Sequence, residues 1–196
     1  MAVMLGLLSV SPVYSAPTHP QELIESTAKF VIAEMRKDKV RLQSDDQALY
    51  AFVEKNILPH FDFEKMSRWV LGKYWRTSNA QERVDFIREF QTLLVRTYAT
   101  SLFEYVDQEF TYLPFKGDLA SGEVTVRTEV SQPGGFPVPI HYRLYNDNGA
   151  WKAYDVTIDD ISLVTNYRAS FGTEIRNGGI RELIRTLAKR NKENTK

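Results

Sequence analysis

The chain has 196 residues, with 25 Lys or Arg against 25 Asp or Glu, so its formal net charge at pH 7 is +0. Balanced charge, without basic residues interleaved with aromatic ones, gives no reason to expect a nucleic-acid partner. The length suits one domain with a sizeable core, and the absence of cysteine excludes disulfides, thiolate catalysis and a lipidated cysteine anchor.

The first fifteen residues predict an export signal. In MAVMLGLLSVSPVYSA an apolar run is followed by small residues up to Ser15, although the basic residue usual in such signals is missing. The run is too short to span a membrane, which takes about 20 apolar residues. We expect residues 1–15 to be a cleaved signal peptide and 16–196 to form a single periplasmic domain; a buried N-terminal strand or helix is the alternative.

Apolar residues at helical spacing predict three helices in the next part of the chain. Their expected ranges are about 20–37, 44–58 and 62–72. Asp62 is placed to cap the third helix, and Gly72 to end it.

The longest predicted element is a helix that begins after Ser78, which forms a capping-box pattern with Gln81. Phe86 and Phe90 extend its apolar surface to a second face, so the helix must be covered from more than one side. Its first apolar face carries Leu94, Tyr98, Leu102 and Tyr105.

The apolar pattern then changes to the alternation of strands. GEVTVRTEVS (122–131) alternates cleanly, residues 138–158 predict a hairpin that turns at Asn148-Gly149, and FTYLPF (110–115) predicts an earlier edge strand. This predicts a curved antiparallel sheet of about four strands. Its apolar face carries Val126, Val130, Val138, Ile140, Tyr142 and Val156.

Two helices are expected to close the chain, at about 163–175 and 180–189, with glycines between them and Ser162 as the first N-cap. Leu163, Val164, Tyr167 and Phe171 share one side of the first. The order of elements predicts an α+β fold with helices wrapped on one face of the sheet. The 11 Phe, 10 Tyr and 3 Trp are explained by a packed core or by a cavity for an apolar ligand.

Signatures of catalysis and metal binding are missing. His19, His60 and His141 lack metal-ligand spacing, and no nucleophile elbow, dinucleotide fingerprint or P-loop occurs, so we predict no catalytic residue, metal or cofactor. The enzymatic alternative is a ketosteroid-isomerase-like cone with Asp155 or His141 as general base. Both residues fall on strand faces opposite the apolar side chains, which favours a structural role.

Four stretches carry a family resemblance. ILPHFDFEKMSRWVLGKYWR (57–76), QTLLVRTYA (91–99), WKAYDV (151–156) and ISLVTNYRASF (161–171) occur in this order, and through them the chain resembles the MlaC family of toluene-tolerance auxiliary proteins. The resemblance covers nearly all of the mature chain. One departure is Asp160, where members commonly have Gly before the last stretch.

The resemblance implies a periplasmic phospholipid carrier that maintains outer-membrane lipid asymmetry. It implies an apolar cavity for acyl chains with the head group at its mouth, and two partners: an outer-membrane lipoprotein–porin complex and an inner-membrane ABC transporter complex with an MCE-domain ring. Besides the enzyme, a lipid-free periplasmic adaptor is a second alternative to the carrier. Periodicity predicts that fourteen residues line the cavity, and Arg168 beside them is a candidate for the head-group phosphate. The fourteen are Leu94, Tyr98, Leu102 and Tyr105 on the long helix, Val126, Val130, Val138, Ile140, Tyr142 and Val156 on the sheet, and Leu163, Val164, Tyr167 and Phe171 on the late helix.

Overall fold

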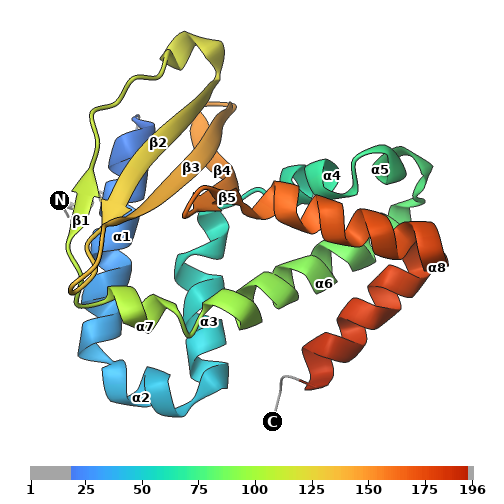
Figure 1. Ribbon diagram of the computed structural model, residues 1–196, viewed down its shortest axis with the longest axis horizontal. Coiled ribbons are helices and arrows are strands. Elements are labelled where there is room, and N and C mark those ends of the chain that lie inside the picture. Colours follow the sequence, from blue (N-terminus) through green and yellow to red (C-terminus); the bar gives the residue numbers. More distant parts are fainter. Residues whose placement is uncertain (1–18, 194–196) are drawn as a thin grey trace, which may run out of the picture.

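The computed structural model describes residues 19–193, and Figure 1 shows its ribbon. An antiparallel sheet lies beside α1, and an arm formed by α4, α5, α6 and α8 extends away from the sheet (Figure 1). The predicted signal peptide lies outside the described residues. None of the helices within 19–193 is long and apolar enough to cross a membrane.

The N-terminal helices follow the predicted pattern, with a short extra helix between the first two. They are α1 (Pro20–Lys37), α2 (Lys39–Ser44), α3 (Asp46–Asn56), the 3-10 turn η1 (Leu58–His60), α4 (Phe63–Leu71) and α5 (Lys73–Thr77). Asp62 caps α4 as expected, because its Oδ1 accepts a hydrogen bond from the Lys65 amide at 2.7 Å. Gly72 ends α4 with φ +54°, a conformation that glycine adopts without strain.

The long helix predicted after Ser78 is divided into α6 (Ala80–Tyr98) and α7 (Leu102–Tyr105). The capping box lies one residue later than predicted: Asn79 Oδ1 accepts from the Glu82 amide at 2.9 Å, and Glu82 Oε2 accepts from the Asn79 amide at 3.0 Å. The Ser78 hydroxyl instead donates to the Tyr74 carbonyl at 2.8 Å, which closes α5.

Within residues 19–193 the sheet has five strands in the order β1-β2-β3-β4-β5, one more than expected. The additional strand β5 is only two residues long and precedes a helix directly, so alternation gives no signal for it. The Asn148-Gly149 turn is confirmed, with φ +52° and +95°. The strands are β1 (Phe110–Tyr112), β2 (Glu123–Val130), β3 (Val138–Asp147), β4 (Ala150–Ile158) and β5 (Ile161–Ser162).

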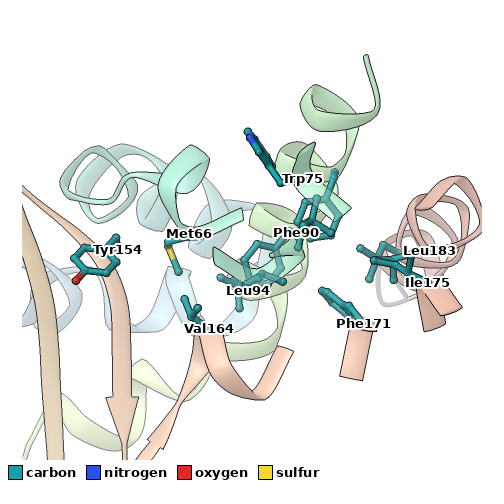
Figure 2. Close-up of a cluster of buried hydrophobic side chains, with 13 residues drawn as sticks. Met66, Trp75, Phe90, Leu94, Tyr154, Val164, Phe171, Ile175 and Leu183 are labelled. Atoms are coloured by element: carbon teal, nitrogen blue, oxygen red, sulfur yellow. The ribbon is translucent and has the colours of Figure 1, made fainter. Parts of the chain in front are cut away.

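A register shift in the β3–β4 pair places Tyr154 on the far side of the sheet. Val126, Tyr142 and Val156 are aligned across β2, β3 and β4 and share the face of the sheet that packs against α1, which we call the inner face. Arg143 pairs with Asp155 but Leu144 pairs with Ala153, so Tyr154 is the unpaired residue of a β-bulge. Its ring contacts Tyr145 at 6.0 Å on the outer face. There it joins side chains of the helical arm in one buried cluster (Figure 2).

The last helix, α8 (Leu163–Glu193), contains the break predicted at the glycines. Gly179 has φ 79° and ψ 170°, which is not helical, and the helix bends sharply in Figure 1. The first part packs beside α4 and α6. The Phe171 ring meets Phe86 and Phe90 edge-on, with centroids 5.9 and 6.0 Å away, and we call these three residues the aromatic cluster.

Candidate functional site

A cavity of about 390 Å³ lies between the inner face of the sheet and the helices. This volume falls in the range of small-molecule sites, roughly 300–1,000 Å³. Tyr142 and Val156 contribute from the sheet, Leu94 from α6 and Leu102 from α7. Segments far apart in the sequence therefore build one continuous apolar wall.

One face of α1 forms a large part of this wall. Ile24, Ala28, Val31 and Met35 recur every three or four residues, which places them on the same side of the helix, facing the cavity. The same helix is held to the sheet because Leu23 and Ile24 pack with Val124, Val126 and other residues of the inner face. α1 is thus both an anchor of the sheet and a wall of the cavity.

The cavity wall carries no charge at neutral pH. Within the described part of the chain, no Asp, Glu, Lys or Arg lines it. Burial raises the pKa of Tyr142 well above its usual value, so its phenol stays protonated. Burial, and then the nearby Lys152, lower the pKa of His60, which favours the neutral imidazole. A neutral, largely apolar wall suits hydrocarbon rather than a hydrated ion.

Eight of the fourteen residues predicted for the cavity line it. They come from all three predicted regions, the long helix, the sheet and the start of the late helix, and are Leu94, Tyr98, Leu102, Tyr105, Ile140, Tyr142, Val156 and Leu163. The structure thus brings together residues that the sequence separates by up to about seventy positions. Whether each of them contacts a bound molecule stays a prediction.

The other six pack elsewhere. Val126 belongs to the cluster that joins α1 to the sheet, and Val130 and Val138 pack with Ile140 and Val156 without reaching the cavity. The remaining three lie with the aromatic cluster and its neighbours; they are Val164, Tyr167 and Phe171. The Tyr167 ring, for instance, meets Phe90 edge-on at 5.3 Å.

The predicted head-group residue Arg168 is not part of the cavity wall. Its side chain is exposed, and its guanidinium lies so close to Gly72 that a Cβ there would be 3.0 Å from Nη2. The structure places this cation beside the α4–α5 junction. A structural contact with the positive-φ turn at Gly72 accounts for its position.

Several cavity residues were not predicted. The inward side of α1 showed helical spacing in the sequence, but that pattern does not reveal which part of the fold the side faces. Phe61 and Phe63 flank the cap of α4, and Phe110 opens β1; these short segments give no period to measure. Among the unpredicted wall residues are Thr27, Ile32, Val53, Ile57, Leu58, His60, Met66, Val95 and Ile158.

The two candidates for a general base do not face the cavity. Asp155 is buried and fully engaged: its carboxylate accepts from the Ser162 hydroxyl at 2.7 Å and from the Val164 amide at 3.1 Å. It therefore fixes the start of α8, where Ser162 also accepts from the Thr165 amide. His141 lies opposite Arg127 in the β2–β3 register, on the outer face of the sheet. Neither Asp155 nor His141 lines the cavity.

The other polar candidates are also accounted for. No group of three or more His, Cys, Asp or Glu within residues 19–193 is placed to hold a metal ion. Three basic residues recur at four-residue spacing on α8, and each forms an ion pair: Arg181 with Glu82 at 2.8 Å, Arg185 with Glu182, and Lys189 with Glu193 at 3.7 Å. The basic side chains of these pairs are exposed, as is typical of a solvated helix face.

An α+β fold with a neutral apolar cavity between sheet and helices defines a class of proteins that bind apolar ligands. The family model described as "MlaC protein" matches residues 25–189, and the chain belongs to the MlaC family. The family prediction and the α+β architecture predicted from the sequence are both confirmed.

Known proteins that are similar to this chain include two relatives by sequence and one solved structure. The intermembrane phospholipid transport system binding protein MlaC of Haemophilus influenzae is 24% identical over 172 residues, covering 86% of this chain and 80% of the relative. The toluene tolerance protein ttg2D of Pseudomonas putida is 25% identical over 178 residues, covering 90% and 82%. A phospholipid-binding protein from Ralstonia solanacearum, solved in complex with a phospholipid, has a TM-score of 0.83 and 28% identity, covering 90% of this chain and 98% of that one.

Proposed function

We propose that this protein is a phospholipid carrier, and that the cavity shields the acyl chains of its cargo. The observation that carries the proposal is the neutral apolar wall of the 390 Å³ cavity, built by α1, α6, α7 and the inner face of the sheet. The structural relative from Ralstonia solanacearum holds a phospholipid in a similar fold, which supports this assignment.

The physical need for such a cavity is large. Each methylene exposed to water costs about 0.8 kcal/mol, so a two-chain lipid with roughly 30 methylenes costs on the order of 20 kcal/mol to move through water unaccompanied. A cavity that covers the chains removes most of this barrier. Because a bilayer offers similar burial, transfer is close to balanced, and the direction must come from the carrier's partners.

In this proposal the acyl chains contact the cavity wall and the head group stays outside it. The wall offers no ion pair to a phosphate, because no Lys or Arg of the described residues lines it. The eight predicted residues that line the cavity are the proposed acyl-chain contacts, joined by the inward face of α1. No catalytic group is needed, because the cargo is not transformed.

We further propose that the carrier works in the periplasm, reached through a signal peptide at residues 1–15. Its proposed partners are an outer-membrane lipoprotein–porin complex and an inner-membrane ABC transporter complex with an MCE-domain ring. The Haemophilus influenzae relative, described as the binding protein of an intermembrane phospholipid transport system, supports this placement. The proposed outcome is the maintenance of outer-membrane lipid asymmetry.

Native mass spectrometry of protein purified from the periplasm tests the carrier function. We expect bound phospholipid in the wild type, and renewed uptake from liposomes after the lipid has been extracted. Ala28→Phe places a ring in the cavity and should abolish uptake. Ala33→Phe, the same change on the exposed side of α1, is the matched control and should carry lipid normally. A wild type that is lipid-free and takes up no lipid would instead identify a protein adaptor.

A further inference from the structure

A second hollow, a groove of about 590 Å³, lies on the face of the sheet opposite the cavity. Alternation along β2 and β3 sends Thr125, Arg127 and Arg143 to this face, whereas Val126 and Tyr142 between them face inward. The groove is therefore separated from the cavity by the thickness of the sheet.

Three basic side chains from separate segments meet in this groove. In the register of β2 and β3, Arg127 lies opposite His141 and Arg143 lies opposite Thr125. The two arginines are therefore diagonal neighbours on one face. Diagonal neighbours lie about 7–8 Å apart, within reach of long side chains. Lys116 joins them because the chain after β1 continues beside β2, where the Leu113 amide donates to the Arg127 carbonyl at 3.0 Å.

Two of these three positive charges are not neutralised by an ion pair within residues 19–193. Neither Lys116 nor Arg127 forms one there, whereas Arg143 forms a long ion pair with Asp155, at 4.0 Å. The Asp155 carboxylate is already occupied by its two hydrogen bonds at the start of α8. Like charges that lie close together repel one another, and a bound anion relieves this repulsion. The groove therefore favours a negatively charged ligand.

The acidic residue in the groove balances these charges only in small part, because its main partner is Lys65 of α4. Glu123 is paired with Lys65 at 2.9 Å and accepts a hydrogen bond from the Tyr154 hydroxyl at 3.2 Å. Lys65 in turn lies over the Tyr145 ring, with its Nζ 3.6 Å from the centroid. Glu123 is thus turned toward α4, and its charge is largely balanced there.

The geometry points to a docking groove for an acidic segment of a partner protein. Arginine forks bind carboxylates through paired hydrogen bonds, and the Arg143 guanidinium is held 5.0 Å from the Tyr154 ring centroid. The Tyr154 ring adds an apolar surface, and 590 Å³ exceeds the volume of a single small anion many times over. A segment with acidic and apolar side chains matches both the charge and the size.

This inference rests on the proposed function, because a carrier that delivers lipid to two membrane complexes must bind proteins as well as lipid. A partner seated on the outer face leaves the cavity on the inner face uncovered. Docking and lipid transfer are therefore compatible in one complex. The charge also speeds encounter with an acidic partner by steering.

The test is the double variant Lys116→Glu/Arg127→Glu. Its binding to each purified membrane complex of the proposed function is measured by surface plasmon resonance at physiological ionic strength. We expect affinity for one complex to fall about tenfold or more. The control, Arg176→Glu/Lys192→Glu on α8, reverses the same number of exposed charges away from the groove and should bind normally. Melting temperature and bound lipid should be unchanged in both variants.

Three results would overturn the docking groove. The first is unchanged affinity for both complexes. The second is calorimetric binding of inorganic phosphate that the double variant loses while both complexes still bind, which would identify a small-anion site. The third is loss of binding only to vesicles containing phosphatidylglycerol, which would identify a membrane contact. If the double variant misfolds, Lys116→Gln/Arg127→Gln replaces it, and a lipid-free wild type would count against the carrier function instead.

Discussion

The aromatic cluster and the cavity wall are both apolar, and α6 contributes to both, yet one is filled and the other is hollow. Phe86 and Phe90 on α6 are fully buried, because Phe171 of α8 meets both rings edge-on. One and two turns further along, Leu94 and Tyr98 face the cavity. The same helix therefore changes from solid packing to an open wall as the elements opposite it change.

The boundary between the two regions is shared. Leu94 and Met66 belong to the buried cluster drawn in Figure 2 and also line the cavity. Figure 2 shows both next to Val164. On the cavity side the opposing surfaces are α1 and the sheet, which are joined to each other through the cluster around Val126 and Leu144. Because α1 packs against the sheet, these two surfaces are buried against each other there rather than against α6.

The largest expected change in the free energy of unfolding comes from removing a ring of the aromatic cluster. Phe90→Ala should lower the free energy of unfolding by about 3–5 kcal/mol, because it removes a fully buried ring and leaves a void among Phe86, Phe171 and Tyr167. Denaturant unfolding followed by circular dichroism measures it. Folded Phe90→Ala should still bind lipid, and a loss below about 1 kcal/mol would contradict solid packing there.

The opposite result is expected at the cavity wall. Leu102→Glu should abolish lipid uptake from liposomes while changing the free energy of unfolding by about 1 kcal/mol, because a charge in an empty cavity can be hydrated but cannot contact acyl chains. Native mass spectrometry and denaturant unfolding separate the two effects. Leu119→Glu, at an exposed leucine of the 3-10 turn η2 (Leu119–Ser121), is the control. Equal loss of folding and uptake would make Leu102 plain core.

A smaller effect, an increase in the free energy of unfolding, is expected in the turn that connects the two regions. Asp159 and Asp160 lie between the cavity strand β4 and the packed helix α8, with φ +48° and +62°, a region that favours glycine. Asp160→Gly should raise the free energy of unfolding by about 0.5–1 kcal/mol and leave lipid uptake unchanged. Asp118→Gly should destabilise, because Asp118 has φ −91° and caps η2. A destabilised Asp160→Gly would show that this carboxylate has a structural partner in the turn.

The sequence predicted more of the elements than of the site. Helical and strand periods and the Asn148-Gly149 turn revealed the architecture, because local spacing and turn chemistry determine them. Val126 and Val156 show why the cavity was harder. They lie in one row on the inner face, on either side of Tyr142, and both belong to alternating sequence patterns, but only Val156 reaches the cavity. Burial is encoded locally, whereas the distance to the opposing wall is set by the packing of the whole fold.

The smallest expected effect is a pH dependence at His60, the imidazole on the cavity wall. Burial, followed by Lys152, lowers its pKa in the folded protein, whereas the unfolded chain titrates near the usual value of about 6.5. As the pH falls below that value, the unfolded chain takes up a proton that the folded protein does not. The free energy of unfolding therefore decreases toward acid and is fully retained above the unfolded pKa.

His60→Gln removes this contribution, so its denaturation midpoint should fall less than that of the wild type between pH values of about 7.5 and 5.5. Lipid uptake by the wild type should weaken only at lower pH, where the folded protein itself is protonated, because the proton places a charge on the wall that acyl chains must contact. The variant should show a flatter uptake profile. If the variant loses more stability than the wild type toward acid, His60 gains protons on folding, and the neutral character assigned to the cavity wall is wrong.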